Sequence, residues 1–145
     1  MIYRLLSDTK DNDLAFIRSA FDSPSIARFI GIDPDNYWHY VTETHGVYFY
    51  KIFREDRLVG TVHCELDKRT LYLSVAVFEG HQNKGIGFEV LCDIIAGKLD
   101  IGFDEIRVSI DENNAASIRL FEKAGFICTA KTDELYEYEY KKTVV

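Results

Sequence analysis

The chain has 145 residues, of which 47% are hydrophobic and only two are prolines, and its net charge is −7. This length suits one domain over residues 1–145 with a single core, and the composition excludes a disordered or low-complexity chain. No basic cluster exceeds the pair Lys141 and Lys142, so binding to nucleic acid or an anionic membrane is disfavoured, whereas an amine suits the acidic balance.

Neither export nor a membrane span is indicated. The first residues lack a basic region followed by an apolar core, and no apolar run approaches the length of a membrane-spanning helix. We therefore expect a cytoplasmic protein. The cysteines, Cys64, Cys92 and Cys128, are odd in number and lie in predicted strands or a helix, so we expect reduced core residues, with neither disulfides nor a metal site.

The N-terminal segment predicts a strand and two helices. Residues 2–6 form a short apolar strand. Three residues that favour helix starts then precede a set of apolar residues at helical spacing: Asp11, Asn12 and Asp13 before Leu14, Ile17, Ala20 and Phe21. Pro24 ends this helix, and Ser25 can cap a second short helix that runs to Ile30 and stops at Gly31.

An aromatic segment leads from these helices into three strands. Residues 33–44 hold Tyr, Trp and His side chains and fit either a short helix over the sheet or one wall of a pocket. Residues 47–54, 58–66 and 71–77 then read as strands because they are rich in β-branched and aromatic residues between short polar turns. Such short connections predict an antiparallel meander.

The third of these strands runs almost directly into a helix, which predicts an anion site. The intervening residues 82–87 read Gln-Asn-Lys-Gly-Ile-Gly, and the helix after them has apolar residues at Phe88, Leu91, Ile94 or Ile95, and Leu99. A helix N-terminus collects unpaired N–H groups and the positive end of the helix dipole, while Gly85 and Gly87 remove side chains that would keep a ligand from the backbone. Phosphate or pyrophosphate suits such a junction best.

Spacing excludes two familiar glycine motifs here. A P-loop needs Lys and then Ser or Thr after its last glycine, but Ile86 and Gly87 follow Gly85. A dinucleotide fingerprint needs a third glycine where Val90 stands. The remaining pattern, Gln-x-x-Gly-x-Gly between a strand and a helix, resembles the acyl-CoA loop of the GNAT superfamily of N-acyltransferases. Without a ligand, the same residues would be a glycine-softened turn.

The C-terminal part predicts a parallel strand, a helix and a hairpin. Residues 105–110 alternate as a strand, which would run parallel to residues 71–77 through a right-handed crossover because a helix separates the two. A capped helix over residues 115–124 stops at Gly125, and a last hairpin has Tyr136, Tyr138 and Tyr140 on one face of its second strand. The order β-α-α-β-β-β-α-β-α-β-β is an α/β (α+β) mixed sheet with helices on both faces.

A second motif strengthens the resemblance. Residues 114–126, Asn-Ala-Ala-Ser-Ile-Arg-Leu-Phe-Glu-Lys-Ala-Gly-Phe, resemble the second GNAT signature, in which Asn opens a helix that ends in Gly-Phe. The resemblance covers nearly the whole chain and implies that acetyl-CoA is the cosubstrate and that no metal takes part. It also implies that Asn114 contacts the pantetheine. The other cofactor-binding residues it implies are Val75, Ala76 and Val77 for the pantetheine arm, and Gln82, Asn83, Lys84, Gly85, Ile86 and Gly87 for the pyrophosphate.

One residue departs from the family pattern. Where many members have a Tyr that can protonate the departing thiolate, this chain has Phe121, which has no proton to give. The general acid is therefore unassigned: another donor or water can serve, or the chain binds acyl-CoA without turning it over. This second alternative is a catalytically silent acyl-CoA-binding module.

Transfer to an amine also needs a proton acceptor and a donor for the oxyanion, which the N–H of Val77 could supply. Glu65 is the first candidate base, and the competing interpretation is a solvent-facing strand carboxylate. His63 shares its strand face, while Glu79 and His81 lie beside the phosphate loop.

The leading hypothesis is therefore an N-acetyltransferase that moves an acetyl group to a primary amine in a ternary complex. The amine could belong to a small molecule or to a peptide or protein. The tyrosines of the last strand could line its pocket or stack on the sheet, and that strand could pair across a homodimer.

Overall fold

The computed structural model describes residues 1–30, 33 and 36–142. A seven-stranded sheet has the order β1-β2-β3-β4-β5-β7-β6. Its strands are β1 (Ile2–Leu5), β2 (Val47–Arg54), β3 (Arg57–Asp67), β4 (Thr70–Val77), β5 (Glu105–Asp111), β6 (Ile127–Thr132) and β7 (Leu135–Lys141). The helices are α1 (Leu14–Phe21), α2 (Pro24–Ala27), α3 (Tyr37–Glu43), α4 (Ile86–Ile95) and α5 (Ala115–Lys123).

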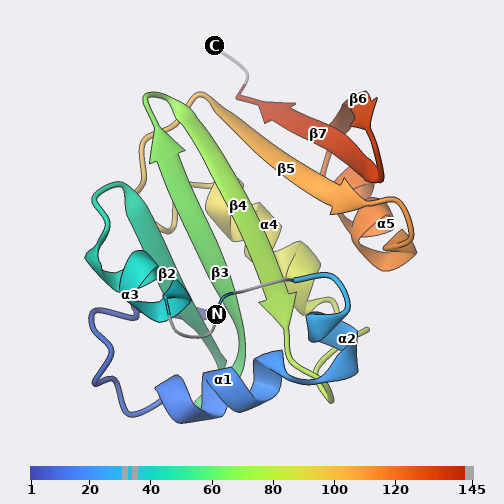
Figure 1. Cartoon of the computed structure of the whole chain (residues 1–145). Coiled ribbons are helices and arrows are strands. Elements are labelled where there is room, and N and C mark those ends of the chain that lie inside the picture. The colour runs from blue at the N-terminus through green and yellow to red at the C-terminus, as the bar shows by residue number, and fades with distance from the viewer. Residues whose placement is uncertain (31–32, 34–35, 143–145) are drawn as a thin grey trace.

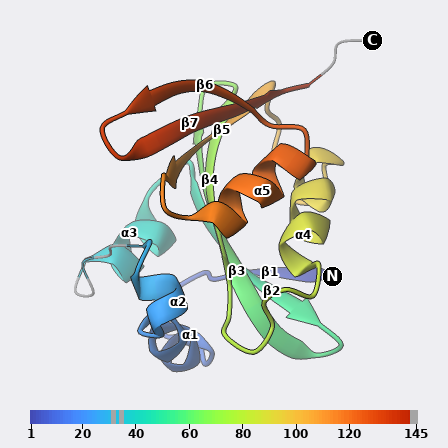
Figure 2. The same cartoon turned by 90° about the vertical axis from the view of Figure 1, so that its right-hand side faces the viewer.

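Helices cover both faces of the sheet, as expected: α1, α2 and α3 lie on one face and α4 and α5 on the other (Figures 1 and 2). Alternation along the strands sorts the apolar side chains into two buried clusters. The larger lies under α4 and α5 and includes Val62, Leu71 and Ile106. The smaller lies under α1 to α3 and includes Trp38 and Phe49. The expected meander of β2, β3 and β4 is confirmed by antiparallel pairing, and β4 and β5 are parallel, as predicted.

The N-terminal helices differ from the predicted order in two ways. A third helix, α3, occupies the aromatic segment, so the helical alternative for that segment is correct. Pro24 starts α2 instead of only ending α1, and Ser23 takes the N-cap position predicted for Ser25. The reason is that proline fits the first turn of a helix, where its missing N–H has no partner to lose. Helix α2 ends at Ala27 and does not reach Ile30 as predicted, and the predicted stop at Gly31 lies outside the described residues.

The parallel pairing of β4 and β5 is short, and this opens the sheet. Only three pairs join the two strands, Thr70 with Glu105, Leu71 with Ile106 and Tyr72 with Arg107. Beyond Tyr72, β4 continues beside β3 and β5 continues beside β7, so the two strands diverge (Figure 1). We call the space between residues 73–77 and 108–111 the split.

The structure shows which cysteines are buried and where the tyrosines of β7 lie. Cys64 is buried, but Cys92 and Cys128 are exposed, so the prediction of core cysteines is wrong for both. Cys92 lies on the outer face of α4, and Cys128 lies on the edge strand β6, whose residues are all exposed. The tyrosines of β7 stack on the sheet: Tyr138 is buried, and the rings of Tyr140 and Phe126 are 5.5 Å apart.

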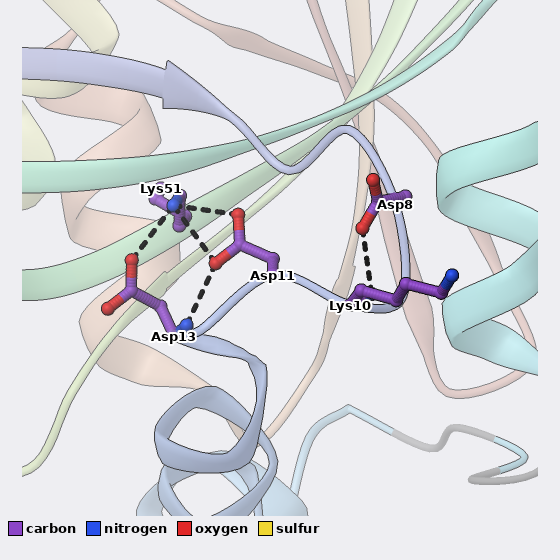
Figure 3. Close-up of polar contacts among 5 residues, drawn as sticks. All are labelled: Asp8, Lys10, Asp11, Asp13 and Lys51. Atoms are coloured by element: carbon purple, nitrogen blue, oxygen red, sulfur yellow. Dashed lines mark hydrogen bonds and ion pairs between the residues drawn. The ribbon is translucent and has the colours of Figure 1, made fainter.

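A buried ion cluster ties the start of α1 to the sheet (Figure 3). The Lys51 ammonium on β2 lies 2.8 Å from Asp11 Oδ2 and 2.8 Å from Asp13 Oδ2, and its side chain is only 9% exposed. Although desolvation opposes the shift, hydrogen bonds from Lys51 and from the Asp13 backbone hold the pKa of Asp11 below its ordinary value. Asp13 takes the N-cap position of α1, as predicted, but its side chain makes no capping hydrogen bond, and the carboxylates of Asp11 and Asp13 both pair with the buried lysine.

Residues 1–30, 33 and 36–142 contain neither a membrane-spanning helix nor a cluster of metal-binding side chains. No helix in these ranges is long and apolar enough to cross a membrane. In the same ranges, no group of three or more His, Cys, Asp or Glu side chains could hold a metal ion.

Candidate active site

The split holds a cavity of about 710 Å³. Its walls come from elements that are far apart in the sequence: α2, β4, the loop before α4, β5 and α5. This volume lies within the usual range for small-molecule sites. The cavity therefore joins the two motif regions found in the sequence on opposite sides of one opening in the sheet.

The β4 wall of the split presents backbone groups that no neighbouring strand occupies. Successive residues of a strand direct their N–H and C=O groups to opposite sides. The Ala76 carbonyl points at Gly60 of β3, and the Phe78 N–H donates to the Val59 carbonyl at 2.9 Å. Val75 and Val77 therefore direct their N–H and C=O groups into the split, whereas the backbone of Ala76, also predicted to bind, is directed to β3. Ala76 still lines the cavity.

The loop before α4 has the backbone conformation that its glycines permit. Gly85 is the N-cap of α4 in the left-handed region, with φ +78°, and a Cβ placed on it would meet nothing within 4 Å. Asn83 is also left-handed, with φ +60°. Asn83, Gly85 and Ile86 line the cavity beside the first turn of α4, while the Lys84 side chain is exposed. An open helix N-terminus thus borders the cavity, as the anion-site prediction requires.

Gly87 and Gln82 have structural roles that the sequence analysis did not predict. A Cβ on Gly87 would lie 2.9 Å from Leu120 Cδ2, so this glycine lets α4 and α5 pack closely. Gln82 uses its side-chain amide to donate to the Val77 carbonyl at 3.0 Å and to Ser25 Oγ at 3.2 Å. The expectation that Gly87 only clears space for a ligand is therefore incomplete, and Gln82 fastens the loop to β4 and α2.

On the opposite wall, Asn114 and Phe121 both line the cavity from α5. Asn114 caps this helix, because its Oδ1 accepts a hydrogen bond from the Ser117 N–H at 3.2 Å. Among the described residues, its other amide atom, Nδ2, has no hydrogen-bond partner and can donate. Phe121 is only 5% exposed, and its ring lies 5.0 Å from that of Phe126 in an edge-to-face arrangement. The ring is thus fixed at the wall but offers no proton.

Three basic residues at the cavity were not identified by the sequence analysis. Arg28, Arg119 and Lys123 line it, and the last two lie four residues apart on α5. Their positive charges suit the phosphates of an anionic ligand. The spacing of Arg119 and Lys123 on one helix face is a signal that could have identified them.

The candidate bases lie on the α1–α3 face, one strand away from the split. His63 and Glu65 of β3 pair directly with Ser74 and Tyr72 of β4, and Ser74 lines the cavity. Glu65 Oε1 accepts a hydrogen bond from the Tyr40 hydroxyl at 2.8 Å and lies 2.9 Å from His63 Nε2. Its side chain is 40% exposed, so Glu65 lies at the surface but is held by these two partners. His81 lines the cavity and Glu79 is exposed.

Several solved acetyltransferases share this fold. A domain from Methanocaldococcus jannaschii DSM 2661 matches with 22% identity, a TM-score of 0.81 and 97% of each chain covered. Spermidine N-acetyltransferase from Vibrio cholerae, solved with CoA and spermine, matches with 15% identity and a TM-score of 0.80. Aminoglycoside acetyltransferase AAC(6')-Ib, solved with coenzyme A and kanamycin, matches with 15% identity and a TM-score of 0.81. Each of these last two alignments covers 97% of this chain and 94% of the other.

Sequence comparison identifies the family. A sequence model of the acetyltransferase (GNAT) family matches residues 11–126. The L-amino acid N-acyltransferase MnaT of Escherichia coli (strain K12) is 32% identical over 68 residues, which cover 47% of this chain and 40% of that protein. The match thus spans less than half the length of this relative. The chain belongs to the GNAT family of acetyltransferases, which confirms the resemblance found in its motifs.

Proposed function

We propose that this protein is an acetyl-CoA-dependent N-acetyltransferase that acetylates a primary amine by direct attack in a ternary complex. The observation that carries the proposal is the split between β4 and β5, where an unpaired strand edge faces a capped helix across a cavity. The edge suits an amide-bearing arm, which can pair with it as another strand would. The helix terminus suits a phosphate.

Each wall of the cavity has a role in holding the cosubstrate. The N–H groups of Val75 and Val77 and the C=O group of Val75 would pair with the pantetheine amides, since Gln82 already donates to the Val77 carbonyl, and Asn114 Nδ2 would donate from the facing helix. The loop from Gln82 to Gly87 would receive the pyrophosphate at the start of α4, where Gly85 leaves open space. Arg119 and Lys123 line the same cavity and would attract the phosphate charges.

The reaction needs a proton acceptor, because an ammonium near pKa 10 has no lone pair. Glu65 would take this proton. The amine nitrogen would then bond to the thioester carbonyl carbon, the C–S bond would break, and the electron pair would leave on sulfur as the CoA thiolate. The Val75 or Val77 N–H would stabilise the oxyanion between these steps. Overall, a protonated amine and the thioester give an amide, free thiol and one proton.

Two measurements test the proposal. At a hundredfold excess over Kd, acetyl-CoA should stabilise the fold by about 2.7 kcal/mol, which raises Tm by about 5–10 °C for a domain of this size. Thiol release should then follow when an amine is added. The first panel should contain amino acids, spermidine and aminoglycosides, the acceptor classes in the names of similar proteins, together with peptides. Absence of stabilisation at millimolar acetyl-CoA would overturn the proposal.

Glu65→Gln tests the base. Glutamine keeps the size of the side chain but accepts a proton poorly, so kcat/KM should fall by roughly 10²–10⁴-fold while acetyl-CoA still stabilises the protein. Glu79→Gln is the matched control, because Glu79 is an exposed carboxylate beside the loop and should be replaceable without loss. A loss below about tenfold in Glu65→Gln would return Glu65 to the role of a surface carboxylate.

A specific observation favours a second candidate, the catalytically silent acyl-CoA-binding module. Phe121 lines the cavity, and on the family pattern it would stand beside the leaving thiolate, to which it has no proton to give. This candidate expects acetyl-CoA to raise Tm as before, but no thiol release with any amine. The two assays therefore separate binding from turnover in one preparation of the protein.

A further inference from the structure

Four side chains form one continuous hydrogen-bonded chain between α3 and β3. The Tyr37 hydroxyl lies 2.7 Å from His63 Nδ1, and His63 Nε2 lies 2.9 Å from Glu65 Oε1. The Tyr40 hydroxyl donates to the same Glu65 oxygen at 2.8 Å. We call these residues the Tyr37–Tyr40 chain. It joins residues that are 25 or more positions apart in the sequence.

With Glu65 ionised and His63 neutral, counting donors and acceptors leaves one arrangement of protons. An ionised Glu65 accepts only, so His63 must carry its proton on Nε2 and donate to Oε1. Nδ1 then has a lone pair, and the Tyr37 hydroxyl must donate to it. Both imidazole nitrogens are thus engaged, and Oε1 receives two donors. Glu65 Oε2 is therefore the atom of the Tyr37–Tyr40 chain that remains available to accept a proton from a bound amine.

We infer that Tyr37, acting through His63, and Tyr40 are positioning residues that hold Glu65 with its Oε2 turned to the incoming amine. The inference rests on the proposed function and adds residues that neither motif contains. Rigid holding is valuable because a proton acceptor must lie within hydrogen-bond reach of the proton that it takes. Glu65 is 40% exposed and would otherwise sample several rotamers.

The surroundings of the Tyr37–Tyr40 chain keep its negative charge on Glu65. Burial lowers the pKa of His63, although Glu65 opposes this, and burial raises the pKa of Tyr37 well above its ordinary value. Both groups are therefore neutral near pH 7. The Tyr37 ring also packs against Trp38 at 4.9 Å and His63 at 5.6 Å, edge to face, which fixes its hydroxyl over β3.

Tyr37→Phe removes only the hydroxyl and tests the role. One lost hydrogen bond should lower kcat by about 3–10-fold, with the KM for acetyl-CoA unchanged. In the Glu65→Gln background the same change should have no further effect on kcat, because Tyr37 acts through Glu65. Tyr50→Phe is the matched control: Tyr50 is half-buried on β2 and faces the opposite side of the sheet, so kcat should not change.

Nitrogen-15 NMR of the imidazole ring gives an independent readout. We expect neutral His63 in the Nε2–H form in both the unaltered protein and Tyr37→Phe, because Glu65 still accepts from Nε2, and we expect the Nδ1 resonance to shift in the variant because Nδ1 has lost its hydrogen-bond donor. A ring protonated on Nδ1 in the unaltered protein would overturn the inference, and so would an equal loss of kcat from Tyr37→Phe with and without Glu65. A protein that binds acetyl-CoA but acetylates no amine would instead overturn the proposed function. The two failures are distinguishable because failure of the positioning role leaves the acetylation of amines intact.

Discussion

Valine at either loop glycine should destabilise the protein for a different reason at each position. Gly85 has φ +78°, where a β-branched residue is strained, and its Cβ would meet open space. Gly87 has ordinary dihedrals for a helix, but its Cβ would lie 2.9 Å from Leu120 Cδ2. Strain of this kind costs about 1–3 kcal/mol, and overpacking costs a similar amount.

The two variants therefore differ in what can rescue them. A loss of about 2 kcal/mol lowers Tm by about 4–8 °C in a domain of this size. Leu120→Ala removes the atoms that Gly87→Val would meet, so the double variant should recover much of that loss. The same change cannot relieve the dihedral strain of Gly85→Val.

Thermal unfolding with and without acetyl-CoA provides the assay. Gly85→Val should lose the stabilisation by acetyl-CoA, because its side chain stands where the pyrophosphate is expected to meet the backbone. Gly87→Val with Leu120→Ala should retain part of it, and Leu120→Ala alone is the control. If the double variant melts no higher than Gly87→Val, then helix packing is not what requires Gly87. If Gly85→Val responds fully to acetyl-CoA, the loop is not the anion site.

The ion cluster of Figure 3 leads to two further predictions. Lys51→Met leaves the carboxylates of Asp11 and Asp13 unpaired and should cost about 2–3 kcal/mol in urea unfolding, less than a fully buried pair because Asp13 is 39% exposed. Lys131→Met breaks a shorter ion pair, 2.6 Å to Glu112, but it is 48% exposed and its loss should change little. Because the pKa of Asp11 is lowered, its contribution to stability is present above about pH 4 and is lost as pH falls through the folded pKa. Equal pH dependence in Lys51→Met below pH 4 would contradict this assignment.

Local signals were sufficient for the central part of the fold. The strand, glycine loop and helix around Gly85, the cap at Asn114 and the left-handed stop at Gly125 each depend on residues within a few positions of one another. The parallel crossover follows from one handedness rule and one intervening helix. These elements could be predicted, and they form the side of the site that faces the expected cosubstrate.

The contacts between α3 and β3 could not be predicted because they are long-range. Tyr37 and Tyr40 meet β3 only after α3 has packed on the sheet, and no short motif encodes that packing. Likewise, the close approach at Gly87 involves the Leu120 side chain on another helix. Burial of the cysteines depended on which face of α4 and which edge of the sheet were left uncovered.

The acid step leads to a last prediction, on Phe121→Tyr. The new hydroxyl would stand on a ring that is 5% exposed and lines the cavity. If it lies beside the leaving sulfur it can donate a proton, but buried without a partner it costs about 1–3 kcal/mol. A thiolate is already stable as an anion, so general-acid help should matter little. We expect turnover that is unchanged or modestly raised, with acetyl-CoA still bound.

Stability and rate measured on the same Phe121→Tyr sample separate the alternatives. A lower Tm without a faster rate would mean that the ring edge faces the core and Phe126, not the sulfur. Phe126→Tyr is the control, because Phe126 is equally buried but does not line the cavity. A fall in kcat/KM of more than about tenfold, with acetyl-CoA affinity intact, would contradict the placement of Phe121 beside the reacting thioester. If the unaltered protein is inactive and Phe121→Tyr is active, then the missing proton donor is the reason that the unaltered protein does not turn over acetyl-CoA.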